Sequence, residues 1–116
     1  MIQRDGKIVV SGTAYDQNEA VSIGFVARFH AAGIQDDSFA TDGVYFGMRS
    51  EENIWSRRIF QQTDGKFVVI GDVSMSSDND GFTYLERLSA DGQTDLSYGF
   101  EGLAMFAKLM PSGYLR

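Results

Sequence analysis

The side chains that could do acid–base or metal chemistry are few and scattered. His30 is the single histidine, and there is no cysteine. A zinc site would need carboxylates beside His30, and a Ser–His–acid triad would need the same histidine, although no Gly-x-Ser-x-Gly turn is present. Asp36–Asp37 and Glu51–Glu52 are adjacent pairs, which point to opposite faces of a strand. We therefore expect no catalytic residue and no cofactor in this chain.

The segment Ser76–Gly81 is the candidate cation site. It combines oxygen-bearing side chains, including Asp78 and Asp80, with a final glycine, as the start of a calcium loop does. The twelfth position of such a loop carries a bidentate glutamate, but here it is Arg87. The segment is therefore either an ordinary solvated loop, which we expect, or a calcium site that uses Asp78 and Asp80.

Most of the chain occurs twice, 59 residues apart. Gln3–Gly12 returns as Gln62–Gly71, and the correspondence then continues without a gap. We interpret the recurring residues as structural. They are Asp5, Gly6, Lys7, Gly12, Arg28, Gly33, Asp36 and Gly43, matched by Asp64, Gly65, Lys66, Gly71, Arg87, Gly92, Asp95 and Gly102.

Each repeat predicts short strands joined by turns, without a helix. An Asp-Gly pair, which readily takes the positive φ angles of a tight hairpin, precedes a Val-rich run in both repeats. The expected strands are Lys7–Gly12, Gly24–His30 and Gly43–Phe46, then Ile54–Gln61, Lys66–Gly71, Phe82–Ser89 and Gly102–Phe106. Four strands make one propeller blade. The predicted fold is all-β: two four-stranded antiparallel propeller-type blades, a fragment of a larger β-propeller.

The repeated Arg and Asp residues have two interpretations. A buried Arg needs a carboxylate partner, so Arg28 with Asp36, and Arg87 with Asp95, could clasp the third strand to the corner after it. A ring of guanidinium groups could instead bind an anion. We favour the clasp, because recurrence in every repeat is typical of a structural role.

Aromatic residues and loops give further expectations. Stacked blades need large side chains between them, although one aromatic could instead stack on a sugar. The aromatic residues expected between blades are Trp55, Phe60, Phe67, Phe82 and Tyr84. The segments Thr13–Ile23 and Asp72–Gly81 differ between the repeats, as variable binding loops would and as unconstrained loops also would.

The pattern Gln-x-Asp-Gly-Lys-(apolar)-Val-Val-x-Gly, followed by an Arg-(apolar) strand and Ala-x-Gly-x-x-Asp-x-Ser-(aromatic), resembles the delta-60 repeat family of bacterial β-propeller proteins. The resemblance covers nearly the whole chain as two copies. It implies blade-like repeats in long proteins, often exported, and hence an extracellular or cell-surface location. It supplies no catalytic residues. Ala32, Ala40 and Thr63 depart from the family's usual Asp or Asn, Gly and Pro.

The repeat divides the chain into residues 1–47, a blade lacking most of its first strand, residues 48–106, a second blade, and residues 107–116, the start of a third. Both ends then cut through a blade. We therefore expect other blades as partners, in cis or by self-association, and a protein or carbohydrate ligand at the loops.

Composition argues against some classes of partner and of function. The net charge of −6 repels phosphate backbones, which argues against nucleic acid. No apolar stretch approaches the ~18 residues of a membrane span, and the start of this chain has no signal-peptide pattern. The expected function is a non-enzymatic scaffold or binding surface. The alternatives are part of a propeller enzyme, such as a polysaccharide lyase or hydrolase that uses further blades, and a structural spacer in a surface protein.

Overall fold

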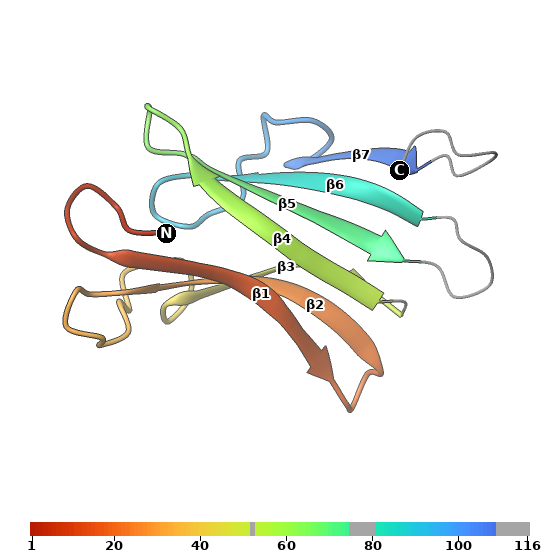
Figure 1. Ribbon diagram of the computed structural model, residues 1–116, viewed down its shortest axis with the longest axis horizontal. Coiled ribbons are helices and arrows are strands. Elements are labelled where there is room, and N and C mark those ends of the chain that lie inside the picture. Colours follow the sequence, from red (N-terminus) through yellow and green to blue (C-terminus); the bar gives the residue numbers. More distant parts are fainter. Residues whose placement is uncertain (52, 75–80, 109–116) are drawn as a thin grey trace.

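Two antiparallel sheets lie face to face in the computed structural model, which describes residues 1–51, 53–74 and 81–108 (Figure 1). The first blade has the strand order β1 (Ile8–Asp16), β2 (Val21–Phe29), β3 (Val44–Ser50). The second has the order β4 (Asn53–Gln61), β5 (Phe67–Ser74), β6 (Gly81–Leu88), β7 (Leu103–Lys108). No helix occurs in these ranges, and hence none that could cross a membrane. The all-β prediction is confirmed.

The strands run beyond their expected ends, which corrects one prediction. Thr13–Ile23 is mostly not a loop, because β1 and β2 pair continuously from Ile8 with Phe29 to Asp16 with Val21. The turn between them is only four residues long, and Asp16 closes it by accepting hydrogen bonds from the amides of Asn18 and Glu19. Likewise, β3 ends at Ser50 and β7 at Lys108, beyond the strand ends expected at Phe46 and Phe106.

The Asp-Gly pairs form hairpin turns in which only the glycine takes a positive φ. Gly6 and Gly65 each have φ of 92°, while the Asp side chain acts as a cap. Asp5 Oδ1 accepts a hydrogen bond from the Lys7 amide at 3.1 Å, and Asp64 bonds Lys66 at the same distance. The acidic residue therefore fixes the turn through its carboxylate and not through its backbone angle.

The repeated Gly12 and Gly71 are explained by aromatic rings on the neighbouring strand. Gly12 pairs with Phe25, and Gly71 pairs with Tyr84. A Cβ at Gly12 would lie 2.8 Å from the Phe25 ring, and a Cβ at Gly71 would overlap the Tyr84 ring. Each strand glycine therefore leaves room for a ring to lie across the sheet.

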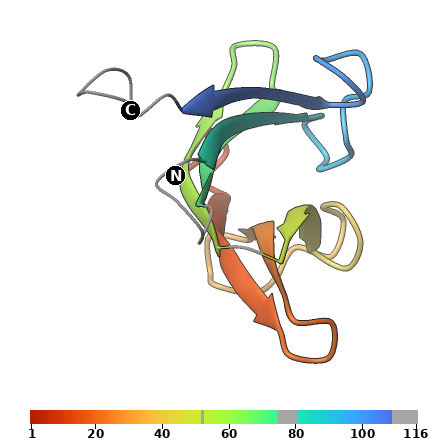
Figure 2. The ribbon, with the colours of Figure 1, turned by 90° about the vertical axis from the view of Figure 1, so that its right-hand side faces the viewer.

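The core lies between the blades. Val9, Val26 and Phe39 of the first repeat pack against the second blade. Their partners there are Phe67, Val69 and Leu88. Figure 2 shows that the sheets diverge from β1 and β4 toward β3 and β7. A second cluster, Ile54, Val73 and Tyr84, continues this contact along β4–β6, with Met48 of β3 packed against it.

Two of the five aromatic residues expected between blades are not covered. Phe67 and Tyr84 are fully buried and Phe82 packs at the edge of the second cluster, but Trp55 is 51% exposed and Phe60 46% exposed. The strand register explains the difference: Trp55 and Phe60 pair with Asp72 and Val68, on the face of the second blade that points away from the first.

Ala40 offers a test of backbone strain at the corner after β2. Its φ is 51°, a region that favours glycine, and its repeat equivalent Gly99 has φ of 55°. We expect Ala40→Gly to raise the free energy of unfolding by about 0.5–1 kcal/mol. Urea unfolding measures the change. A loss of stability would show that packing of the Ala40 methyl group against the core outweighs the strain.

Candidate functional site

A buried carboxylate holds the corner of the first repeat together. Asp36 is 2% exposed and accepts hydrogen bonds from Arg28 Nε at 2.8 Å and from Ser38 Oγ at 2.6 Å. Lys7 Nζ lies 3.3 Å from the same carboxylate. The hydrogen bonds from Ser38, helped by Lys7 and Arg28, hold the pKa of Asp36 well below its usual range although burial opposes them. The structure thus contains the clasp favoured from the sequence.

The second repeat contains the same clasp, but more open to solvent. Arg87 Nε donates to Asp95 at 2.8 Å, and Lys66 Nζ lies 3.3 Å from Asp95. The Asp95 side chain is 11% exposed and that of Arg87 21% exposed. Hydrogen bonds from Ser97 are the largest cause that lowers the pKa of Asp95. The clasp therefore recurs, with less cover in the second repeat.

The first clasp also joins the two blades. Arg28 Nη1 donates to the Ala90 carbonyl at 3.1 Å, and the Ala40 amide donates to the Asp91 carbonyl at 2.7 Å. The 90–92 turn of the second repeat therefore docks on the corner of the first. The Arg28 guanidinium lies 4.7 Å from the centre of the Phe39 ring, which closes the apolar side of this joint.

A pocket of about 560 Å³ lies between β3 and β7, and the buried Glu86 is among the residues that line it. Glu86 is 8% exposed, accepts a hydrogen bond from the Tyr45 hydroxyl at 3.1 Å and accepts another from the Met48 amide at 3.3 Å. Burial raises the pKa of Glu86, and these two hydrogen bonds oppose the rise. Burial and the Glu86 charge together raise the pKa of Tyr45 to about 12.

Glu86 gives a pH-dependent prediction. Since its pKa is raised in the folded state, ionisation of Glu86 opposes folding as pH rises from about 4.5, its ordinary value, through the folded pKa. The stability of Glu86→Gln relative to the wild type should therefore be higher at pH 7 than at pH 4. Urea midpoints at both pH values measure this. As the control, Tyr45→Phe removes a donor and should steepen the dependence. The same pH dependence in the wild type and in Glu86→Gln would contradict the prediction.

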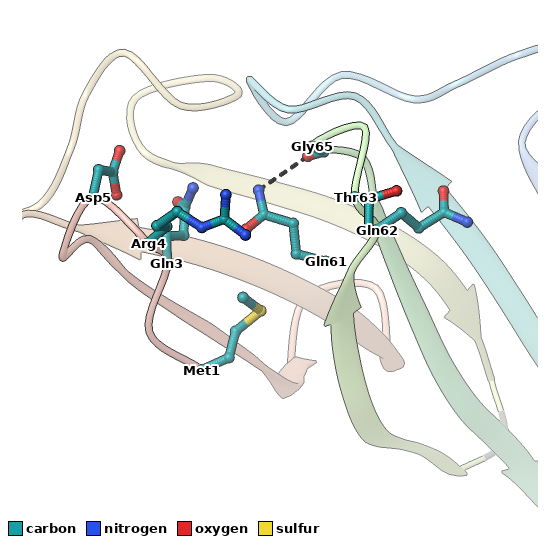
Figure 3. Close-up of a pocket in the computed structure, with 8 residues that line it drawn as sticks. All are labelled: Met1, Gln3, Arg4, Asp5, Gln61, Gln62, Thr63 and Gly65. Carbon is teal, nitrogen blue, oxygen red and sulfur yellow. Dashed lines mark hydrogen bonds between the residues drawn. The ribbon is translucent and has the colours of Figure 1, made fainter.

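Apart from the Glu86 pocket, a groove of about 450 Å³ runs between the two repeated hairpin turns (Figure 3). The first turn contributes Gln3, Arg4 and Asp5, and residues 61–65 of the second turn line the other side. Figure 3 shows the Arg4 guanidinium extending toward Gln61, whose amide donates to the Gly65 carbonyl at 3.1 Å. The groove offers charged and amide hydrogen-bonding groups beside apolar surface of nearly the same extent.

The remaining sequence candidates do not gather into a site. The His30 side chain is 49% exposed, and its Nε2 lies 3.7 Å from Asp36. Asp37 is exposed, whereas its neighbour Asp36 is buried. Asp78 and Asp80 lie outside the described residues. Within the described ranges, no three carboxylate or His side chains are close enough to share a metal ion.

Sequence reasoning missed Glu86 and Tyr45 as a pair. The repeat equivalent of Glu86 is Ala27, and that of Tyr45 is Ala104. A carboxylate in place of alanine, on the face that carries Tyr84 and Leu88, was the signal that could have revealed a buried acid.

Comparison with known proteins gives one match. A family model described as a domain of unknown function (DUF5122) beta-propeller matches residues 3–39 and residues 62–98. Searches of the curated proteins and of the solved structures give no match. The two matched segments begin 59 residues apart, which is the spacing of the repeat.

Proposed function

Because the chain belongs to the DUF5122 β-propeller family, we propose that it is a non-catalytic propeller segment, two consecutive blades that serve as a scaffold or binding surface. The observation that carries this proposal is that equivalent apolar residues of the two repeats differ in how far they are exposed. Val69 is 3% exposed inside the joint, while Val10, its equivalent on the outer face of the first blade, is 41% exposed. Apolar faces of this kind need neighbouring blades.

Adding a blade in cis tests the proposal. A second copy of residues 48–106, inserted after residue 106, should cover the outer face of the second blade. We expect a higher melting temperature and weaker binding of an apolar dye. A Gly/Ser insert of the same length is the control. If the added blade performs no better than the control, the chain is not a segment that further blades complete.

The groove between the hairpin turns is the proposed binding surface. Its amide, guanidinium and carboxylate groups suit a polar ligand, such as a carbohydrate or a peptide. Arg4→Ala and Gln61→Ala should each weaken binding of any glycan or peptide found by array screening, whereas Arg49→Ala, on β3, should not. Equal effects of all three substitutions would contradict this placement.

Glu86 favours one second candidate, a part of a propeller enzyme such as a polysaccharide lyase or hydrolase. A carboxyl with a raised pKa beside a phenol in a pocket is suited to proton transfer. Cleavage of a polysaccharide that Glu86→Gln abolishes, at unchanged folding, would establish this candidate. It would also overturn the non-catalytic proposal.

We also propose that the repeats are of the delta-60 type, that the natural protein is bacterial and acts outside the cell or at its surface, and that it needs no cofactor. The resemblance of the repeated motifs to the delta-60 family supports the first two points. Fractionation of cells that produce the natural protein tests its location, and recovery from the cytosol alone would contradict it. Calorimetric titration with calcium tests the last point, since submicromolar binding lost on Asp78→Ala would contradict it.

A further inference from the structure

We propose that two copies of this chain bind head to tail, with the outer face of the second blade of one copy docked on the outer face of the first blade of the next. The inference rests on the proposed function and adds a partner, a second copy. The contact would repeat the joint inside the molecule, shifted by 59 residues.

The internal joint is built from two different surfaces, and each has an open counterpart. Its first side, with Val9, Val26 and Phe39, has equivalents on the outer face of the second blade. We call these equivalents, Val68, Leu85 and Tyr98, the head face. The joint's second side has equivalents on the outer face of the first blade. We call these equivalents, Ile8, Val10 and Phe29, the tail face.

The head and tail faces are more exposed than the equivalent surfaces inside the joint. Val9, Phe39, Phe67 and Leu88 are fully buried inside it. Their equivalents on the head and tail faces, Val68, Tyr98, Ile8 and Phe29, are all only partly buried. The residues have kept their apolar character while lacking cover. The head and tail faces are therefore complementary to one another, as the two sides of the internal joint are.

Polar groups at the corner repeat the same relation. Inside the molecule, Arg28 Nη1 donates to the Ala90 carbonyl. Shifted by 59 residues, Arg87 would donate to the Ala31 carbonyl of the second copy. In the described part of the chain, Arg87 bonds Asp95 through Nε and makes no turn contact comparable to that of Arg28.

The docking turn is preformed in the first repeat. Gly33 has φ of 92° and Gly92 has φ of 91°, so the two turns share their backbone conformation at this position. Gly92 is buried against Phe39 and Ala40. A Cβ at Gly33 would meet no atom within 4 Å, so the first turn is uncovered and free to dock.

The shifted joint lacks the ionisable pair of the internal joint. At the internal joint the buried Glu86 carboxylate accepts a hydrogen bond from the half-buried Tyr45 hydroxyl. In the shifted joint both positions are alanine, Ala27 on the tail face and Ala104 beside the head face. Docking would therefore bury neither a carboxylate without a donor nor a phenol without an acceptor.

Because its two sides differ, such a contact runs head to tail, and it forms a closed ring if the rotation between copies closes and an open fibre if it does not. Propellers close with about 4–8 blades. Rings of two, three or four copies are therefore the expected assemblies.

Two single substitutions test the proposal by light scattering coupled to size-exclusion chromatography. Val10→Arg places a charge on the tail face, and Leu85→Arg places one on the head face. We expect the wild type to associate as its concentration rises, and each variant to associate more than about 100-fold more weakly, because docking would bury an unpaired charge. Leu96→Arg is the control, since Leu96 is 70% exposed and its equivalent Asp37 stays exposed at the internal joint.

Mixing the two variants gives the decisive result. Each variant keeps one intact face, so an equimolar mixture should form a heterodimer and stop there. A wild type that stays monomeric, variants that associate like the wild type, or a mixture that stays monomeric would each overturn the proposal. If the cis insertion of residues 48–106 nevertheless stabilises the chain, the propeller function stands and only the second copy is wrong. Circular dichroism melting confirms that each variant folds.

Discussion

Replacing Asp36 by Asn is expected to lower the free energy of unfolding by about 3–5 kcal/mol, a large part of the stability of a small domain. Arg28 is buried, with its side chain 8% exposed, and Asp36 is its carboxylate partner. An Asn side chain keeps the shape but loses the charge, so the guanidinium would remain buried without an opposite charge. Lys7, 3.3 Å away, would lose the same partner.

The repeat provides the control. Asp95→Asn removes the equivalent carboxylate, but Arg87 is more exposed than Arg28 and water can solvate it. We expect a clearly smaller loss than for Asp36→Asn. Urea unfolding of both variants at pH 7 measures the difference. Equal losses would show that the clasp does not gain strength from its burial in the joint.

The same carboxylates should control the acid limit of the fold. Both pKa values are lowered in the folded state, so each ionised carboxylate stabilises the fold above its unfolded pKa, near 3.8. That stabilisation is lost as pH falls below this value. Asp36→Asn should flatten the loss of stability between pH 4 and pH 2, and an unchanged acid transition would contradict the assignment.

Gly92→Ala should destabilise the protein by about 2–4 kcal/mol, the second large effect. A Cβ there would lie 2.8 Å from the Ala40 amide nitrogen and 2.9 Å from the Phe39 ring, at a backbone φ of 91°. The substitution therefore adds a clash in the joint to backbone strain. The 90–92 turn would have to move away from the corner it docks on.

Gly33→Ala isolates the strain from the clash. Gly33 has almost the same φ but no atom within 4 Å of its Cβ position. Gly33→Ala should therefore lower the free energy of unfolding only by the backbone strain, about 1 kcal/mol. Denaturant midpoints of both variants, measured at a concentration where the protein is monomeric, give the comparison. A loss at Gly33 as large as that at Gly92 would mean that the joint contributes nothing at this point.

The repeat made much of the fold predictable, because it carries the turns and the cross-strand partners in order. Asp5, Gly6 and Arg28 could be assigned to a turn and a clasp since each recurs with its partner at a fixed spacing. The strand ends were less predictable. Backbone pairing of β1 with β2 depends on both strands together, and the varied sequence of Thr13–Ile23 concealed it.

The features that were missed are those that differ between the repeats. The pairing of Glu86 with Tyr45 involves strands from different blades, and only the packing of the blades brings the two side chains together. Trp55 and Phe60 were predicted to pack between blades, but which face of β4 they occupy depends on the register shift between Ser56 and Arg58. A shift of that kind reverses the faces of a strand and leaves no signal in composition.

The position of Trp55 gives the molecule an optical reporter. It is the single tryptophan of the chain, and half of its side chain is exposed on the outer face of β4. Indole emission moves to shorter wavelength when water is replaced by apolar surroundings. The intrinsic fluorescence of the unlabelled protein should therefore shift whenever anything covers this face, so that every contact made there can be followed in real time at submicromolar concentration.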